Sequence, residues 1–143
     1  MNGNNSGGSR RILIIGNGAA GLAAAKSARA QDPDAEITMF GADNHLPYYR
    51  LRLCEYIGKS VDPDELVINS EEWFRKKRIQ VEVNSKVTEI HPDERKIRVN
   101  GKEYSYDSLV LATGSTPVMP SFEGKELKGI HTIWTLEDVA DIN

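Results

Sequence analysis

The chain has 143 residues, of which 39% are hydrophobic and 27% are charged, a composition typical of one soluble globular domain with a single core. The net charge of -3 and the sequence pI of about 5.6 argue against nucleic acid or an anionic membrane as the main partner, because both favour basic surfaces. The single cysteine, Cys54, excludes an internal disulfide, and the histidines have no ligand spacing, so no metal site is predicted.

The first residues are rich in Asn, Gly and Ser and contain no apolar stretch. Residues 1–9 are therefore predicted to form a flexible tail and not a signal peptide. The sequence has no apolar run long enough for a membrane span, so we expect a cytoplasmic protein with no membrane partner.

A strand, a tight turn and a helix are predicted after this tail. Arg11 to Ile15 is a short apolar run that ends in glycine, as is typical of a buried parallel strand. Alanines and a leucine recur at helical spacing from Ala19 to Ala30, and Glu36 to Phe40 has the pattern of a second parallel strand. Together these segments predict a right-handed βαβ unit.

Two short helices and a strand are predicted next. Tyr48 to Gly58 suits a short helix, and a second helix is predicted through Lys77, with Asn69 as its N-cap. The basic residues at 75–78 follow at the helix end, where cations suit the helix dipole, so we interpret them as solvated. Ile79 to Val83 is the next predicted strand.

Three short alternating segments then predict an antiparallel meander. Their bounds are Lys86 to Ile90, Lys96 to Val99 and Lys102 to Ser105. Asn100-Gly101 between the last two is a strong hairpin signal. Ser108 to Ala112 returns to a buried strand pattern and leads into a second glycine turn at Gly114. The predicted fold is α/β, with a Rossmann-like parallel sheet and a three-stranded antiparallel meander as a crossover.

The most informative motif is Gly16-x-Gly18-x-x-Gly21, which lies between the first strand and the first helix. In a dinucleotide site the first glycine permits a tight turn, the second lets the backbone approach a pyrophosphate, and the third lets helix and strand pack closely. Free amides at the helix start then face the phosphates. The alternative is a strand-to-helix turn that needs only a positive φ. The strand and helix on either side favour the dinucleotide interpretation.

Three motifs in this order resemble the FAD-binding N-terminal part of the pyridine nucleotide-disulfide oxidoreductase superfamily. They are the glycine turn at 16–21, HLPYYRLRL at 45–53 and YDSLVLATGSTP at 106–117. Within the superfamily the chain looks most similar to NADH:rubredoxin reductases and to the flavin module of NADH-dependent nitrite reductases. The resemblance covers residues 10–143 and implies FAD as the cofactor and NAD(P)H as the substrate of the complete enzyme.

The resemblance also implies which residues bind FAD. The first glycine turn would surround the pyrophosphate, the turn after the last strand would close over the cofactor, and the backbone of Val87 would pair with the adenine edge. By itself Val87 equally suits an ordinary strand valine. The residues of the two turns are Gly16, Gly18, Ala19, Ala20, Gly21, Ala112, Thr113 and Gly114.

The sequence departs from the family pattern after the second strand, where an acidic residue often binds the ribose hydroxyls. Gly41 and Ala42 stand there, so Asp43 is the remaining candidate, either for the ribose or as a cap of its own loop. Arg50 is expected to bind the flavin or its phosphates through charge-assisted hydrogen bonds. The alternative for Arg50 is a surface arginine on a short helix.

Cys54 lies near the redox cysteine of disulfide-type and NADH-oxidase-type relatives. Alignment through residues 56–58 places that cysteine at Leu51, so Cys54 is not expected to be the nucleophile. We expect a small, buried, apolar residue there instead. The alternative is that Cys54, one helical turn from Leu51, faces the flavin. No residue is predicted to be a catalytic acid or base.

The resemblance divides the chain into a tail at 1–9, a first segment of an FAD-binding domain at 10–118, and a connector at 119–143 toward an NAD(P)H-binding domain. We therefore expect part of an FAD-dependent NAD(P)H oxidoreductase with a rubredoxin- or nitrite-reductase-like acceptor, incomplete for turnover alone. Its partners would be the missing domain or a partner chain, and a redox acceptor protein. The alternatives are a non-catalytic module that binds an adenine dinucleotide, and a structural half-domain.

Overall fold

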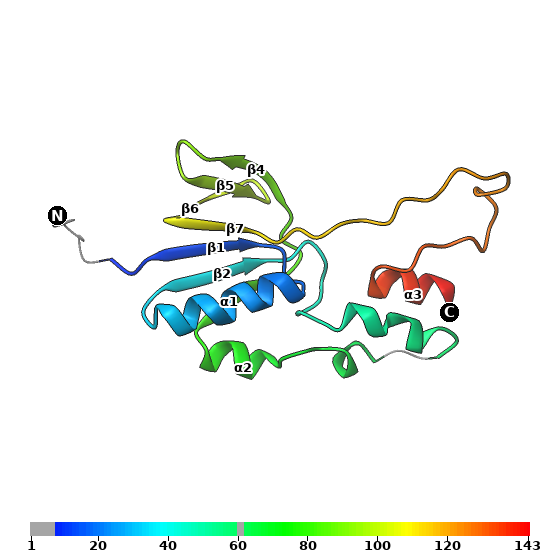
Figure 1. Cartoon of the computed structure of the whole chain (residues 1–143), viewed down its shortest axis with the longest axis horizontal. Helices are drawn as coiled ribbons and strands as arrows, with labels where there is room; N and C mark the ends of the chain where they lie inside the picture. Colours follow the sequence, from blue (N-terminus) through cyan, green and yellow to red (C-terminus); the bar gives the residue numbers. More distant parts are fainter. Residues whose placement is uncertain (1–7, 60–61) are drawn as a thin grey trace.

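A computed structural model describes residues 8–59 and 62–143, so positions 1–7 of the predicted tail lie outside the described residues. Figure 1 shows a layered α/β fold. In chain order, the helices and strands, with the 3-10 helices named η, are β1 (Arg11–Ile15), α1 (Ala19–Gln31), β2 (Glu36–Phe40), η1 (Arg50–Tyr56), η2 (Pro63–Glu65), α2 (Glu71–Lys76), β3 (Ile79–Glu82), β4 (Val87–His91), β5 (Lys96–Val99), β6 (Lys102–Ser105), β7 (Ser108–Leu111) and α3 (Leu136–Ile142).

The main sheet has the strand order β3-β2-β1-β7, and each neighbouring pair is parallel. Side chains of β1 alternate between its two faces. Ile12 and Ile14 pack with helices α1 and α2 on one face, while Leu13 and Ile15 pack with the meander on the other. Figure 1 shows these two layers on opposite sides of the sheet. The predicted parallel sheet and βαβ unit are confirmed, and β1 is apolar throughout its buried part because both of its faces are covered.

The meander is a separate antiparallel sheet with the strand order β4-β5-β6. Asn100 and Gly101 both have positive φ, 48° and 79°, as the predicted tight hairpin requires. Ile97 and Val99 point into the core, where Phe40 also meets the ring of Tyr104 edge-on at 5.0 Å between centroids. The meander therefore covers the face of the main sheet that the helices leave open.

Two local predictions are wrong. The N-cap of α2 is Ser70 and not Asn69, because the Ser70 hydroxyl accepts the Trp73 backbone N–H at 3.3 Å. Cys54 is exposed, although it was predicted to be buried. It lies in η1, which is a 3-10 helix with three residues per turn, so Leu53 and Tyr56 share the buried face and the two residues between them turn outward.

The three glycines of the first turn have different roles. Gly16 has a φ of 106°, and a Cβ atom there would lie 2.1 Å from the Ala112 carbonyl oxygen. A Cβ at Gly21 would lie 2.0 Å from the Gly16 carbonyl oxygen. A Cβ at Gly18 would meet nothing within 4 Å. The first and third glycines therefore permit close packing of the backbone, whereas the second leaves an open surface.

This difference gives a test of stability. We expect Gly16→Ala to lower the free energy of unfolding by about 2 kcal/mol or more, because it adds both a clash and an unfavourable φ. Gly18→Ala is the matched control and should cost less than about 1 kcal/mol. Urea unfolding followed by circular dichroism measures both. Equal losses would contradict the assignment of Gly16 to close packing.

Candidate functional site

A cleft of about 560 Å³ opens at the carboxyl ends of the parallel strands. This is the edge at which open α/β sheets bind their ligands. The lining comes from the ends of β1, β2 and β7, from the start of β4, and from η1 and the segment before α3. It includes these residues of the predicted site: Gly16, Gly18, Asp43, Arg50, Val87, Ala112, Thr113 and Gly114.

Backbone hydrogen bonds place the two glycine turns at this edge. The Gly16 N–H donates to the Phe40 carbonyl at 2.8 Å, and the Ala112 N–H donates to the Ile15 carbonyl at 2.8 Å. The turns that follow β1 and β7 thus continue the pairing of their strands. Gly16 and Gly114 therefore lie at the same edge of the sheet.

The N-terminus of α1 faces this cleft through its cap, Gly18. Gly18 has no side chain to bond the first amides of the helix, and its carbonyl accepts the Leu22 N–H at 2.9 Å, which begins the helical ladder. The N–H groups of Ala19 and Ala20 have no acceptor within the helix, and both residues are exposed. Partial positive charge and free donors therefore meet at an open surface, which suits a phosphate group. Gly21 lies buried beneath the turn, where it serves the packing described above.

Asn17 is a cleft residue that the sequence analysis missed. Its side-chain amide donates to the His45 carbonyl at 2.7 Å. A Cβ atom on Gly41 would lie only 2.3 Å from the Asn17 Nδ2. The space above Gly41 is thus filled by Asn17, which explains why a glycine stands where the family pattern often has an acidic residue. No local pattern in the sequence links these two positions.

Asp43 lies in a loop that is held against the start of the meander. The Ser85 N–H donates to the Gly41 carbonyl at 2.6 Å, and the Asn84 N–H donates to the Asp43 carbonyl at 2.8 Å. The Asp43 carboxylate lies 3.7 Å from the Arg50 Nη2. The structure therefore brings Asp43 and Arg50 together on one wall of the cleft.

The Arg50 guanidinium lies close to two aromatic rings. Its guanidinium carbon is 5.0 Å from the ring centre of Tyr48 and 4.9 Å from that of Trp134. Its Nη1 also donates to the Trp134 carbonyl oxygen. Arg50 is thus a fixed cation in the cleft wall and not a freely exposed surface arginine.

Burial raises the pKa of Tyr48 to about 12, although the nearby Arg50 charge acts in the opposite direction. Tyr48 therefore stays neutral at ordinary pH, and the Arg50 guanidinium faces an uncharged ring on the Tyr48 side.

Trp134 and Thr135 also line the cleft, and both belong to the segment that was predicted to be only a connector.

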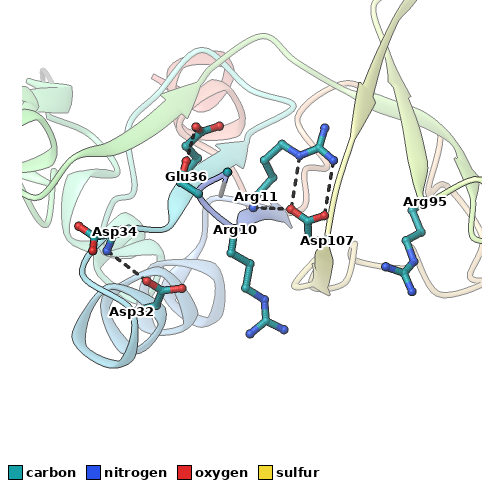
Figure 2. Close-up of a pocket in the computed structure, with 9 residues that line it drawn as sticks. Arg10, Arg11, Asp32, Asp34, Glu36, Arg95 and Asp107 are labelled. Atoms are coloured by element: carbon teal, nitrogen blue, oxygen red, sulfur yellow. Dashed lines mark hydrogen bonds and ion pairs between the residues drawn. The ribbon is translucent and has the colours of Figure 1, made fainter. Parts of the chain in front are cut away.

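A second cavity of about 1000 Å³ lies at the other edge of the sheet, by the start of β1. Figure 2 shows its charged side chains, which include Arg10, Arg11, Asp32 and Asp107. Asp107 accepts the Arg11 backbone N–H at 2.8 Å and faces the Arg11 guanidinium, and these bonds lower the pKa of Asp107. Arg11 and Asp107 thus join the start of β1 to the residue before β7, so we assign this edge to strand anchoring.

Residues 8–59 and 62–143 contain no group of three or more His, Cys, Asp or Glu side chains placed to hold a metal ion. None of the helices in the described part of the chain is both long and apolar enough to cross a membrane.

The family model "Pyridine nucleotide-disulphide oxidoreductase" matches residues 10–143. The chain belongs to this family. Members of this oxidoreductase family bind FAD and NAD(P)H. The match of the family model confirms the predicted family. The cleft fits FAD because the open face of Gly18 and the free amides of α1 lie together at the edge of the cleft.

Several relatives in this family are similar over most of the chain. The NADH-rubredoxin oxidoreductase of Clostridium acetobutylicum is 38% identical over 108 residues, which are 75% of this chain and 28% of that protein. The NADH oxidase of Lactococcus lactis is 35% identical over 127 residues, which are 85% of this chain and 28% of that protein. The crystal structure of the Clostridium acetobutylicum NADH:rubredoxin oxidoreductase superposes with a TM-score of 0.82 at 32% identity, covering 94% of this chain and 35% of that one.

This comparison confirms the predicted fold as the FAD-binding portion of such reductases. It also shows that the chain spans only about 30% of the length of the curated relatives that it matches.

The raised pKa of Tyr48 predicts how stability changes in alkali. A tyrosine whose pKa is about 12 when folded and 10.0 when unfolded contributes stability below pH 10, and that contribution is lost as the pH rises toward 12. We expect the thermal midpoint of Tyr48→Phe to rise relative to that of the wild type between pH 10 and pH 12. A constant difference between the two midpoints across this range would contradict the assignment.

Proposed function

We propose that the chain is the FAD-binding portion of an NAD(P)H oxidoreductase that passes electrons from NAD(P)H, via the flavin, to an acceptor of the rubredoxin or nitrite reductase kind. The observation that carries this proposal is the α1 N-terminus, capped only by Gly18, which opens onto a cleft at the carboxyl ends of the strands. Such a site binds anions through backbone amides. The family of the chain supports FAD as the ligand.

Each wall of the cleft has a proposed role in holding the cofactor. The amides of Ala19 and Ala20 bind the pyrophosphate, and the missing side chain at Gly18 leaves room for it. Arg50 adds a cation on the facing wall, where two rings hold its guanidinium. Gly16 and Gly21 bind nothing themselves in this proposal but let the turn pack tightly enough to expose those amides.

The remaining predicted residues lie where they suit the other parts of the cofactor. Asp43 accepts ribose hydroxyls, and the backbone of Val87 pairs with the adenine edge. The turn at Thr113 and Gly114 covers the cofactor from the end of β7. When bound, FAD supplies the hydride-accepting and electron-transferring chemistry, while the protein supplies position and electrostatics.

The NAD(P)H site is proposed to lie outside these 143 residues, either further along the same polypeptide or in a partner chain. Two observations support this proposal: the sequence has a single Gly-x-Gly-x-x-Gly turn, and the matched relatives are about three times as long. A relative from Bacillus subtilis, 30% identical, is named as the electron transfer subunit of an assimilatory nitrate reductase. It supports an acceptor outside the flavin-binding portion.

The first test concerns Gly18. Gly18→Val should raise the dissociation constant for FAD at least tenfold, roughly, because the side chain would occupy the space left for the pyrophosphate. Quenching of flavin fluorescence on titration measures the constant. Gly8→Val is the control, since Gly8 is equally unobstructed but lies at the other cavity, and its affinity should match the wild type. Wild-type affinity in Gly18→Val would mean that the turn serves packing alone.

The second test concerns turnover. With FAD supplied, these 143 residues should oxidise NADH with ferricyanide no faster than free FAD does, because nicotinamide and flavin lack a shared frame. Such positioning accounts for roughly 7 to 11 kcal/mol of a reaction barrier. The assay compares steady-state rates with and without protein. A rate far above the free-FAD blank would place an NADH site within these residues and overturn this part of the proposal.

A further inference from the structure

We propose that Trp134 is a positioning residue, which holds the Arg50 guanidinium in the cleft wall so that it binds the diphosphate of the cofactor. This inference rests on the proposed function, because it takes a dinucleotide diphosphate as the ligand. It goes beyond that function by giving a role to the segment before α3, for which the sequence analysis expected only a connection to another domain.

The Arg50 guanidinium keeps hydrogen-bond donors for a ligand. This group has five N–H donors. Among the described residues it makes one hydrogen bond, to the Trp134 carbonyl oxygen. The Asp43 carboxylate lies at 3.7 Å, which is an ion pair but too long for a hydrogen bond. The group therefore keeps donors for an anion, and its side chain is 28% exposed at the cleft.

The Trp134 ring restricts the Arg50 guanidinium. The ring centre lies 4.9 Å from the guanidinium carbon, and Tyr48 provides a second ring at 5.0 Å. A planar guanidinium that contacts two rings and donates to the Trp134 carbonyl loses much of its rotamer freedom before a ligand arrives. Since that loss otherwise opposes binding, a pre-ordered Arg50 binds an anion more tightly than a free one.

Hydrogen bonds at the start of α3 hold Trp134 itself. The Asp138 carboxylate accepts the backbone N–H groups of Trp134 at 2.7 Å and Thr135 at 2.8 Å. The Thr135 hydroxyl accepts the Asp138 N–H at 3.1 Å, which completes a capping box at the start of α3. Trp134 is therefore fixed at the N-terminal end of α3.

Helix α3 in turn is anchored on η1. Leu136 and Val139 are buried in one cluster with Leu53 and Tyr56. At the other end of α3, the Asn143 side chain accepts the Gly58 N–H at 2.6 Å. In Figure 1 the extended segment after β7 runs away from the sheet and returns to place α3 beside η1. The fold thus delivers Trp134 to Arg50 from a distant part of the chain.

The experiment is a double-mutant cycle on the whole chain, with FAD and ADP as separate probes and calorimetry as the readout. Trp134→Leu should raise the dissociation constant of each probe about five- to tenfold when Arg50 is present. In the Arg50→Met background the same change should raise it less than about twofold, because the group that Trp134 positions is gone. ADP has no flavin, so an effect on both probes assigns the contact to the diphosphate.

Two further variants separate positioning from general damage. Trp134→Phe keeps a ring over Arg50 and should lose less than about threefold. Trp73 is the matched control, because it also lies under a cation, with the Lys26 Nζ 4.9 Å from its ring, but packs against Phe74 away from the cleft. Trp73→Leu should leave both constants unchanged. As a binding readout independent of affinity, ADP should shift the indole N–H signal of Trp134 and not that of Trp73.

Equal losses from Trp134→Leu in the two Arg50 backgrounds, or equal losses in the Leu and Phe variants, overturn the positioning role while FAD binding stands. An effect on FAD alone, with none on ADP, overturns the assignment to the diphosphate. A wild-type chain that binds neither probe overturns both this inference and the proposed function.

Discussion

The close approach of two backbone turns is the constraint on which the rest of the site depends. Gly16 lies against the Ala112 carbonyl so tightly that even a methyl group has no space there. This contact joins the end of β1 to the end of β7, and it fixes where α1 begins. Because the turn is compact, the first amides of α1 point to the strand ends and not into the core. The exposure of these amides at the cleft, which suits an anion, thus follows from a packing requirement.

The walls of the cleft other than the glycine turn carry charged side chains. These walls come from segments that are far apart in the chain. Asp43 lies on a loop that continues the pairing of β2 with β3 beyond the strand ends, and Arg50 belongs to η1. Trp134 arrives with α3. A rigid amide-lined turn on one side and a stacked cation on the other suit a ligand with a central diphosphate. The cleft combines backbone donors at the start of α1 with a side-chain cation, Arg50, that contacts two aromatic rings.

The sequence predicted the features that depend on neighbouring residues. Apolar runs ending in glycine indicated β1 and β7, and Asn100-Gly101 indicated the hairpin, because each signal is local. The sequence-based prediction was wrong where burial depended on the type of helix. Cys54 was expected to be buried, but the 3-10 geometry of η1 turns its side chain outward. The prediction also missed Asn17, which fills the space over Gly41, and Trp134, which reaches Arg50 only through the docking of α3. Those contacts join distant segments that no local spacing connects.

The place of β7 in the sheet has a consequence for the order of events during synthesis. This strand pairs with β1, and the first anchoring contact between them, from Arg11 to Asp107, spans 96 residues of chain. Closing so long a loop is entropically costly and kinetically slow. While the ribosome is still making the meander, the glycine turn after β1 exists without the strand that braces it. The cleft, which β7 completes, therefore forms late in the synthesis of these residues.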